Sequence, residues 1–211
     1  MHRSKIAFTL LLSVAFVGCA EGPLWKAGSY VPWVQNEWAA EEEIVDTLYE
    51  RKSMIDQLVE SALTDEQKDE AAKRLQEIAT RDSVLLIRLH AVEKLGQLDN
   101  SVAISALQSA SRDPNAKIRV AAAKSWGQFP ADQAVPHLQE MLGSDTDVDV
   151  RLAATSMLGK FSGPSVLEAL SMALDDTNPA VQLRAMDALE NSTGEQLGTS
   201  VAAWKSFISQ R

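Results

Sequence analysis

The chain has 211 residues, of which 45% are hydrophobic and 23% charged, a balance typical of one soluble globular domain plus a short targeting segment. Its 29 acidic residues outnumber its 20 basic ones, and the formal net charge is −9. Because contacts to phosphates need clustered Lys and Arg, we expect no nucleic-acid partner. The single cysteine, Cys19, excludes an intramolecular disulfide and a cysteine-based metal cluster.

The first eighteen residues have the pattern of a secretory signal peptide. A basic start, Met1 to Lys5, precedes an apolar run, Ile6 to Val17. This run is too short for a membrane-spanning helix, which needs about 20 apolar residues. The stretch Phe16-Val17-Gly18-Cys19 resembles the lipobox of bacterial lipoproteins, although Leu is usual at its first position and Ala or Ser at its second. The resemblance implies cleavage after residue 18 and acylation of Cys19. An ordinary secretory peptide with an incidental cysteine is the alternative.

The residues after the cysteine extend this prediction. Ala20 stands where Asp favours retention in the inner membrane of Gram-negative bacteria, so the resemblance implies a lipid anchor in the outer membrane that faces the periplasm. Residues 19–36 contain Gly22, Pro23, Gly28 and Pro32, and we expect them to form an extended tether behind the lipidated Cys19.

The remainder of the chain repeats with a period of 31 or 32 residues. A β-branched residue followed by Arg or Gln recurs at spacings of 31, 32 and 31, as Ile87-Arg88, Ile118-Arg119, Val150-Arg151 and Val181-Gln182. Alanine follows at Ala91, Ala122, Ala154 and Ala185, and a large apolar residue at Leu95, Trp126, Leu158 and Leu189. Aspartate precedes each unit at Asp82, Asp113, Asp145 and Asp176, and a second apolar set recurs at Leu107, Leu138 and Leu170.

These spacings predict pairs of helices. Ile87, Ala91 and Leu95 are four residues apart and share one helix face, and Leu107 belongs to the stripe of a second helix. We expect the repeated Asp to cap the first helix or to form the turn before it. The glycine that ends this helix in three units (Gly96, Gly127 and Gly159) predicts a left-handed closing residue.

The repeated pattern D-x4-[VI]-R-x2-A-x3-L-G resembles HEAT repeats, including those of phycobilisome-lyase-like proteins. The resemblance implies an all-α fold, a right-handed α-α superhelical solenoid, in which stacking buries the apolar faces. It covers residues 82–193. We expect residues 37–81 to be a degenerate opening pair, with a helix over residues 37–62 and a second helix that begins at Thr64 in a capping box with Gln67. Residues 194–211 are predicted to form a capping helix with Val201, Trp204 and Ile208 on its inner face.

Several side chains suggest chemistry but have a simpler structural interpretation. The series Arg88, Arg119 and Arg151 resembles the HEAT ladder in which each Arg pairs with the Asp of a neighbouring repeat, and we prefer that role to binding of an acidic ligand. The run Asp145 to Asp149 resembles part of a calcium loop but lacks the Gly and Glu of an EF-hand, so we expect a turn. His90 and His137 lack the i, i+4 partner of a helical zinc site. Trp25, Trp33 and Trp38 are expected to pack on the first helices, an exposed interface being the alternative.

No enzymatic motif emerges, and we expect no catalytic residue, no metal site and no cofactor. The hypothesis from the sequence is a lipid-anchored scaffold or adaptor, not an enzyme, that binds a protein or peptide partner at the cell envelope. Its expected binding face comprises second-helix residues: Ser105, Gln108, Gln139, Glu140, Glu168 and Ser171. Two alternatives remain open. One is a HEAT-type lyase or metal-dependent enzyme, by analogy of fold, and the other is a structural spacer or oligomer subunit without a ligand.

Overall fold

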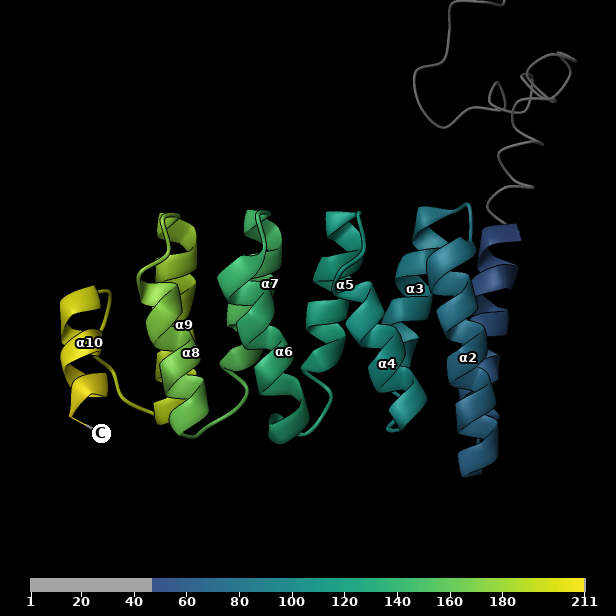
Figure 1. Ribbon diagram of the computed structural model, residues 1–211, viewed down its shortest axis with the longest axis horizontal. Helices are drawn as coiled ribbons and strands as arrows, with labels where there is room; N and C mark the ends of the chain where they lie inside the picture. The colour runs from purple at the N-terminus through teal and green to yellow at the C-terminus, as the bar shows by residue number, and fades with distance from the viewer. Residues whose placement is uncertain (1–46, 211) are drawn as a thin grey trace, which may run out of the picture. The chain divides into compact units, whose positions relative to one another are not determined.

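A computed structural model describes residues 47–210 of the chain, in which every regular element is helical (Figure 1). Residues 50–210 belong to one compact unit. This unit begins within a helix that includes residues 47–60. It continues with α2 (Asp65–Arg81), α3 (Leu85–Leu95), α4 (Ser101–Ala110), α5 (Ala116–Trp126), α6 (Ala131–Ser144), α7 (Val148–Leu158), α8 (Pro164–Leu174), α9 (Pro179–Thr193) and α10 (Val201–Ser209). The predicted signal peptide, Cys19, the tether and the three tryptophans before residue 47 lie outside the described residues.

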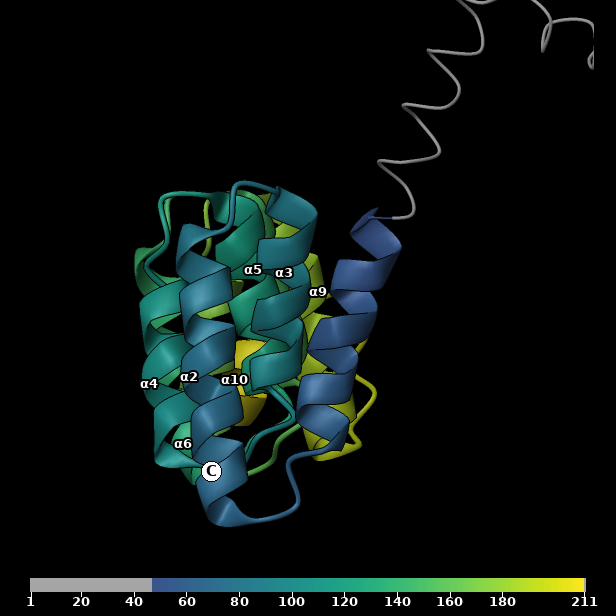
Figure 2. The ribbon, with the colours of Figure 1, turned by 90° about the vertical axis from the view of Figure 1, so that its right-hand side faces the viewer.

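The helices of residues 50–210 stack in two layers, which confirms the predicted all-α solenoid. Figure 2 shows α3, α5 and α9 in one layer and α2, α4 and α6 in the other. Within the first layer α3 packs on α5, α5 on α7 and α7 on α9, whereas α2 packs on α4 and α6 on α8 in the second. Across the layers α3 contacts α4, α5 contacts α6 and α7 contacts α8, and these three pairs are the repeating units.

The repeated apolar positions form the core between the layers, as predicted. Ile87, Ile118, Val150 and Val181 are at most 1% exposed, and the four repeated alanines and the four large residues that follow them are fully buried. Leu107, Leu138 and Leu170 of the second layer are fully buried as well. Burial of an aliphatic side chain of this size contributes about 1.5–3 kcal/mol to the free energy of folding. The residues that recur every 31 or 32 positions are therefore the ones that stabilise the stack.

The repeated glycines do end their helices, but the predicted left-handed conformation is wrong. Gly96, Gly127 and Gly159 end their helices with φ of −62°, −64° and −63°, in the right-handed region. The next unit lies close to all three, and an added Cβ would meet side-chain ends at Gly96 and Gly127 but backbone at Gly159. A Cβ atom on Gly159 would lie 2.9 Å from both Cα and Cβ of Ala188. The left-handed closing glycine occurs instead at Gly194, with φ of 77°, after the longer helix α9.

The repeated aspartates form the turn before each first helix, and the N-cap stands two residues later. Asp113 Oδ1 accepts a hydrogen bond from the backbone N–H of Asn115, and the Asn115 side chain in turn caps α5. Asp147 and Asn178 occupy the same capping position in α7 and α9. The helix therefore begins later than a simple Asp cap would place it.

Both ends of the described stack have their own closing features. The predicted capping box of α2 is confirmed, since Thr64 accepts from the backbone of Gln67 and the Gln67 side chain accepts from the backbone of Thr64. At the other end Trp204 of α10 is fully buried and its Nε1 donates to the Gly198 carbonyl over 2.9 Å. None of the helices within residues 47–210 combines the length and apolar character that a membrane-spanning helix requires.

Candidate functional site on the second-helix face

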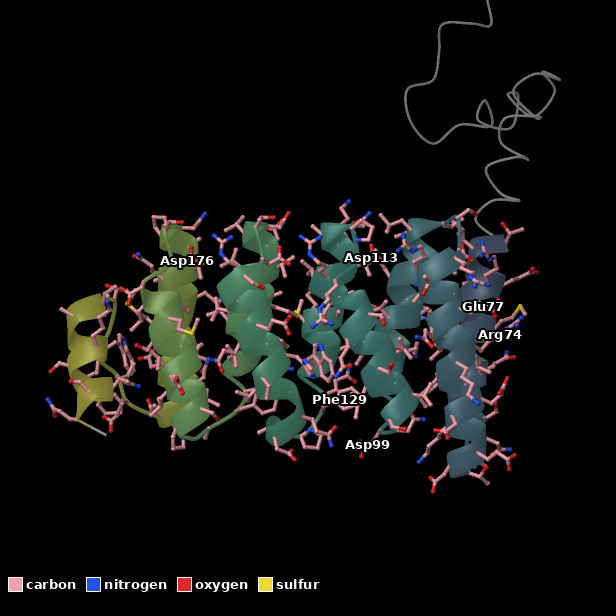
Figure 3. The ribbon with its side chains drawn as sticks, viewed as in Figure 1. Arg74, Glu77, Asp99, Asp113, Phe129 and Asp176 are labelled. Atoms are coloured by element: carbon pink, nitrogen blue, oxygen red, sulfur yellow. The ribbon has the colours of Figure 1, made fainter. Side chains whose placement is uncertain are left out.

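The repeated Arg and Asp residues meet in pairs along one edge of the solenoid, where the turns precede α5, α7 and α9. Asp113 and Asp176 mark this edge in Figure 3. Arg88 pairs with Asp113, Arg119 with Asp145 and Arg151 with Asp176, so each guanidinium joins its own unit to the next. The first aspartate, Asp82, pairs with Arg51 of the helix that includes residues 47–60.

The geometry of these pairs is that of a structural element. Arg119 Nε and Nη2 donate to the two carboxylate oxygens of Asp145 over 2.7 and 2.8 Å, and Nη1 donates to the carbonyl of Asp113 over 2.9 Å. Arg151 repeats the arrangement on Asp176. Gln182, which replaces Arg in the last unit, keeps only the bond to a backbone carbonyl, that of Asp176. The guanidinium groups have no free face for an acidic ligand.

The same contacts account for the carboxylates of the run that resembles a calcium loop. Burial raises the pKa of Asp145, but the hydrogen bonds from Arg119 and from the backbone of Asp147 outweigh burial and leave that pKa below its ordinary value. Asp147 accepts from the backbone N–H of Asp149 and caps α7. In this run the carboxylates of Asp145 and Asp147 therefore already have protein partners, and Asp149 lies in the first turn of α7.

The residues expected to form a binding face lie on helices of the second layer, and the structure divides them between two hollows. We call the surface formed by α4, α6 and α8 on this side the second-helix face. Gln108 and Glu140 line a small hollow between α4 and α6, and Glu168 and Ser171 line a larger one beside α8. Gln139 joins the two regions, because its Nε2 lies 3.6 Å from Met172 Sδ. Ser105 is exposed on α4 and lines neither hollow.

The small hollow contains a histidine that the sequence interpretation treated as an ordinary helix residue. His137 stacks on the buried Trp126, with ring centroids 4.3 Å apart and an interplanar angle of 28°. Trp126 Nε1 donates to Ser111 Oγ over 3.0 Å, which fixes the indole across the space between α5 and the second layer. A sequence signal for this arrangement exists. Trp126 replaces the leucine of the other units, and Ser111 replaces the leucine found at Leu142 and Leu174.

The surroundings of His137 favour a neutral imidazole. Burial is the main effect that lowers its pKa, and Arg112 lowers it further, while Glu140 opposes both. The amide nitrogen of Gln108 lies 3.2 Å from His137 Nε2 and can only donate, so Nε2 accepts and the ring proton resides on Nδ1. A neutral half-buried imidazole beside a carboxylate is the type of group that accepts or donates a proton in catalysis.

Three charged residues line this hollow: Asp145, which is already paired with Arg119, and the more exposed Arg112 and Glu140. Arg112 Nη2 lies 3.0 Å from Glu140 Oε1, in a pair in which both side chains are more than half exposed. The hollow has a volume of about 60 Å³, room for a side-chain end or a few waters. The larger hollow, beside α8, has a volume of about 800 Å³.

A family profile for HEAT repeats matches residues 71–158 and 105–190, together more than half of the chain. This chain belongs to the HEAT-repeat family. The HEAT-repeat protein is also 30% identical over 162 residues to deoxyhypusine hydroxylase from Eremothecium gossypii, in an alignment that covers 76% of the chain and 48% of the relative. It is similar in structure to human deoxyhypusine hydroxylase in complex with glycerol, with a TM-score of 0.52 and 28% identity over 59% of this chain and 44% of that one. The HEAT-repeat protein thus spans about half the length of these relatives.

These relatives correct two expectations from the sequence. Both carry the name of an enzyme, which contradicts the hypothesis of a lipid-anchored scaffold or adaptor and the expectation that the chain is not an enzyme. The alternative of a HEAT-type enzyme agrees with them better. The repeat pattern could not reveal this, because it records only how the helices stack, and the reactive positions of a solenoid lie outside that pattern.

The described residues do not provide a cluster of metal-binding side chains. Transition-metal sites in proteins are built from clusters of His, Cys, Asp and Glu. Within residues 47–210 no group of three or more such side chains is close enough together to hold an ion. His137 lies beside one carboxylate, Glu140, and the other histidine of this part of the chain, His90, contacts Asp56 of the helix that includes residues 47–60. No reaction step is therefore assigned to a metal.

Proposed function

We propose that this HEAT-repeat protein is an enzyme related to deoxyhypusine hydroxylase, with its reaction site on the second-helix face and His137 as the side chain that transfers a proton. The single observation that carries the proposal is the setting of His137. It combines a stacked and hydrogen-bonded ring with a lowered pKa, at an open hollow, in a chain whose named relatives are enzymes.

The geometry supports a distinct role for each residue around the hollow. Trp126 holds the imidazole plane, and Gln108 sets its tautomer so that Nδ1 carries the proton. Arg112 and Glu140 lie at the rim, where they can orient a polar substrate by one charge each. A neutral imidazole can accept a proton on Nε2 at neutral pH once a substrate displaces the Gln108 amide, and a positioned acid or base accelerates reactions by about 10²–10⁴-fold.

The first substrate to assay is a protein that bears deoxyhypusine, since both relatives carry that name. The purified full-length chain is incubated with it in air and a reductant, with and without ferrous iron, and the product is analysed by mass spectrometry. We expect a change in the mass of the deoxyhypusine-bearing protein whose rate falls at least about 100-fold in His137→Gln. The matched control is His90→Gln, which replaces the same residue type in the other layer and should retain activity.

Two outcomes would contradict the proposal. One is the absence of product with the unaltered chain under every condition. The other is an equal rate in His137→Gln and His90→Gln, which would place the reaction away from the second-helix face.

We also propose that the chain is exported and anchored through lipid on Cys19, in the outer membrane and facing the periplasm. The support is the order of basic, apolar and lipobox residues in the first nineteen positions, which lie outside the described part of the chain. Two or three acyl chains would hold the protein stably, because each buried CH₂ contributes about 0.8 kcal/mol.

The anchor is tested by growing bacteria that express the chain with a radiolabelled fatty acid. Label should enter the full-length chain and be absent from Cys19→Ser, which should also leave the membrane fraction. Equal labelling or equal membrane retention of the two chains would contradict the anchor.

A further inference from the structure

The larger hollow on the second-helix face has the size of a ligand site. It lies between α8, the end of α9 and α10, and its volume of about 800 Å³ is within the range of about 300–1,000 Å³ that is common for binding pockets. Leu167, Met172 and Ile208 contribute apolar walls. Met172 is 44% exposed although it is a large apolar residue, and methionine adapts its shape to different bound surfaces.

The polar groups of this hollow differ in whether they already have partners. The hydroxyls of Ser162, Ser192 and Thr193 donate to the backbone carbonyls of Ser192 and Leu189. Glu168, by contrast, is exposed and makes no hydrogen bond or ion pair within residues 47–210. Its carboxylate is therefore available to pair with a cation, whereas the nearby Asp175 is already paired with Lys205.

A contact between α6 and α8 lies between the two hollows. Met172 borders the larger hollow and lies next to Gln139 on α6, the helix that also carries His137 and Glu140. A ligand that reaches both hollows must cross from α6 to α8. An extended peptide meets that requirement, and HEAT-type solenoids present extended faces of this kind.

We propose that the larger hollow anchors a peptide segment of a protein substrate, by enclosing an apolar side chain while a neighbouring Lys or Arg pairs with Glu168. The proposal rests on the proposed function, because it places an anchoring site beside the reaction site at His137. The net charge of −9 favours the approach of a basic segment. The apolar side chain supplies most of the contact area, and the ion pair selects for a basic neighbour.

The test measures binding without turnover. The probe is a fluorescently labelled, blocked peptide with one leucine flanked by lysines, and its counterpart has glutamates in place of the lysines. Binding to the full-length chain is followed by fluorescence anisotropy, and the site is mapped by NMR of ¹³C-methyl methionine. We expect the lysine peptide to bind, to shift the Met172 methyl signal and to weaken with salt, and the glutamate peptide to bind at least several-fold more weakly.

Two variants and a control locate the contact. Glu168→Gln should weaken the lysine peptide roughly threefold, as expected for a solvent-exposed ion pair. Ser171→Trp fills the hollow and should weaken it more than about tenfold. Glu70→Gln, on the exposed side of α2 at the other end of the stack, is the matched control and should bind like the unaltered chain. Unfolding curves confirm that each variant is folded.

Each contrary result overturns the proposal: no binding at millimolar peptide, equal binding of the two peptides, equal binding by Glu168→Gln and Glu70→Gln, or tighter binding of a fatty acid than of the peptide. The two proposals fail separately. His137→Gln should retain peptide binding while losing activity, so a chain that binds the peptide through Glu168 but has no activity contradicts only the proposed function.

Discussion

The turn edge of the solenoid and its second-helix face use charged residues in opposite ways. At the turn edge Arg119 and Asp145 have side chains that are 15% and 8% exposed, and each has a bidentate partner. On the second-helix face Arg112 and Glu140 are 68% and 51% exposed, and Glu168 has no partner in the described residues. The repeated charges are largely buried and join neighbouring units, whereas those of the second-helix face are exposed, and Glu168 has no partner within the described residues.

The largest expected effect concerns stability at the turn edge. Arg119→Met leaves Asp145 nearly buried and without its partner, and loss of one member of a buried pair costs about 3–5 kcal/mol. Because these side chains are only partly buried, we expect a free energy of unfolding lower by about 2–3 kcal/mol in urea titrations. The matched control, Arg81→Met, breaks the exposed pair with Glu77 and should cost less than about 0.5 kcal/mol. Equal losses would remove the distinction between the two kinds of charge.

The second prediction concerns the pair of residues that departs from the repeat. Trp126→Leu restores the residue of the other units but leaves a cavity and deprives Ser111 of its donor, so we expect a loss of about 2–3 kcal/mol. Adding Ser111→Leu should recover at least about 1 kcal/mol, because the two leucines would pack as in the neighbouring units. Calorimetry of the single and double variants measures this coupling. Additive losses would mean that the two departures are unrelated.

The third prediction separates two glycines at equivalent positions. Gly159→Ala places a Cβ 2.9 Å from the backbone of Ala188, whereas Gly127→Ala meets the flexible end of Met157, with its Sδ at 2.6 Å. Backbone cannot yield as a methionine side chain can, so we expect a loss of about 1–3 kcal/mol for Gly159→Ala and clearly less for Gly127→Ala. Thermal unfolding of the two variants provides the comparison. The reverse order would contradict close approach as the reason for these glycines.

The smallest effect is a dependence of stability on pH. Because His137 has a lowered pKa in the folded chain, the unfolded chain binds more protons as the pH falls below about 6.5. Its contribution to stability is therefore present at neutral pH and is lost as the pH falls toward the folded pKa. We expect His137→Gln to lose less stability than the unaltered chain between pH 7 and pH 5. Parallel losses in urea titrations at the two pH values would contradict a lowered pKa.

The sequence predicted the stack well because its signal is repeated. The apolar positions of Ile87, Ala91 and Leu95 have equivalents at the same spacing in every unit. Their burial follows from helical geometry alone. The sequence alone does not reveal the role of Gly159. Glycine is needed there because α9 lies close to it, and a contact with a distant helix cannot be read from the residues next to Gly159. For Asp113 the sequence left a cap and a turn open, and the structure shows the turn, with the cap at Asn115.

The candidate site could be predicted only in part. Gln108, Glu140, Glu168 and Ser171 were placed on one face by helical spacing, but spacing cannot tell that they border two separate hollows. His137 was missed because no pattern in its own helix marks it. Its environment comes from Trp126 on another helix, and the departure of Trp126 and Ser111 from the repeat was the available signal.

The most direct test of the account is an NMR titration of the His137 imidazole in the full-length chain. The account predicts that His137 titrates below the ordinary value of about 6.5 and that the pKa moves toward this value in the double variant Trp126→Leu, Ser111→Leu, which no longer encloses the ring. A ring that titrates at or above 6.5 in the unaltered chain, or that is indifferent to the loss of Trp126, would contradict the claim that this unit departs from the repeat in order to hold a reactive histidine.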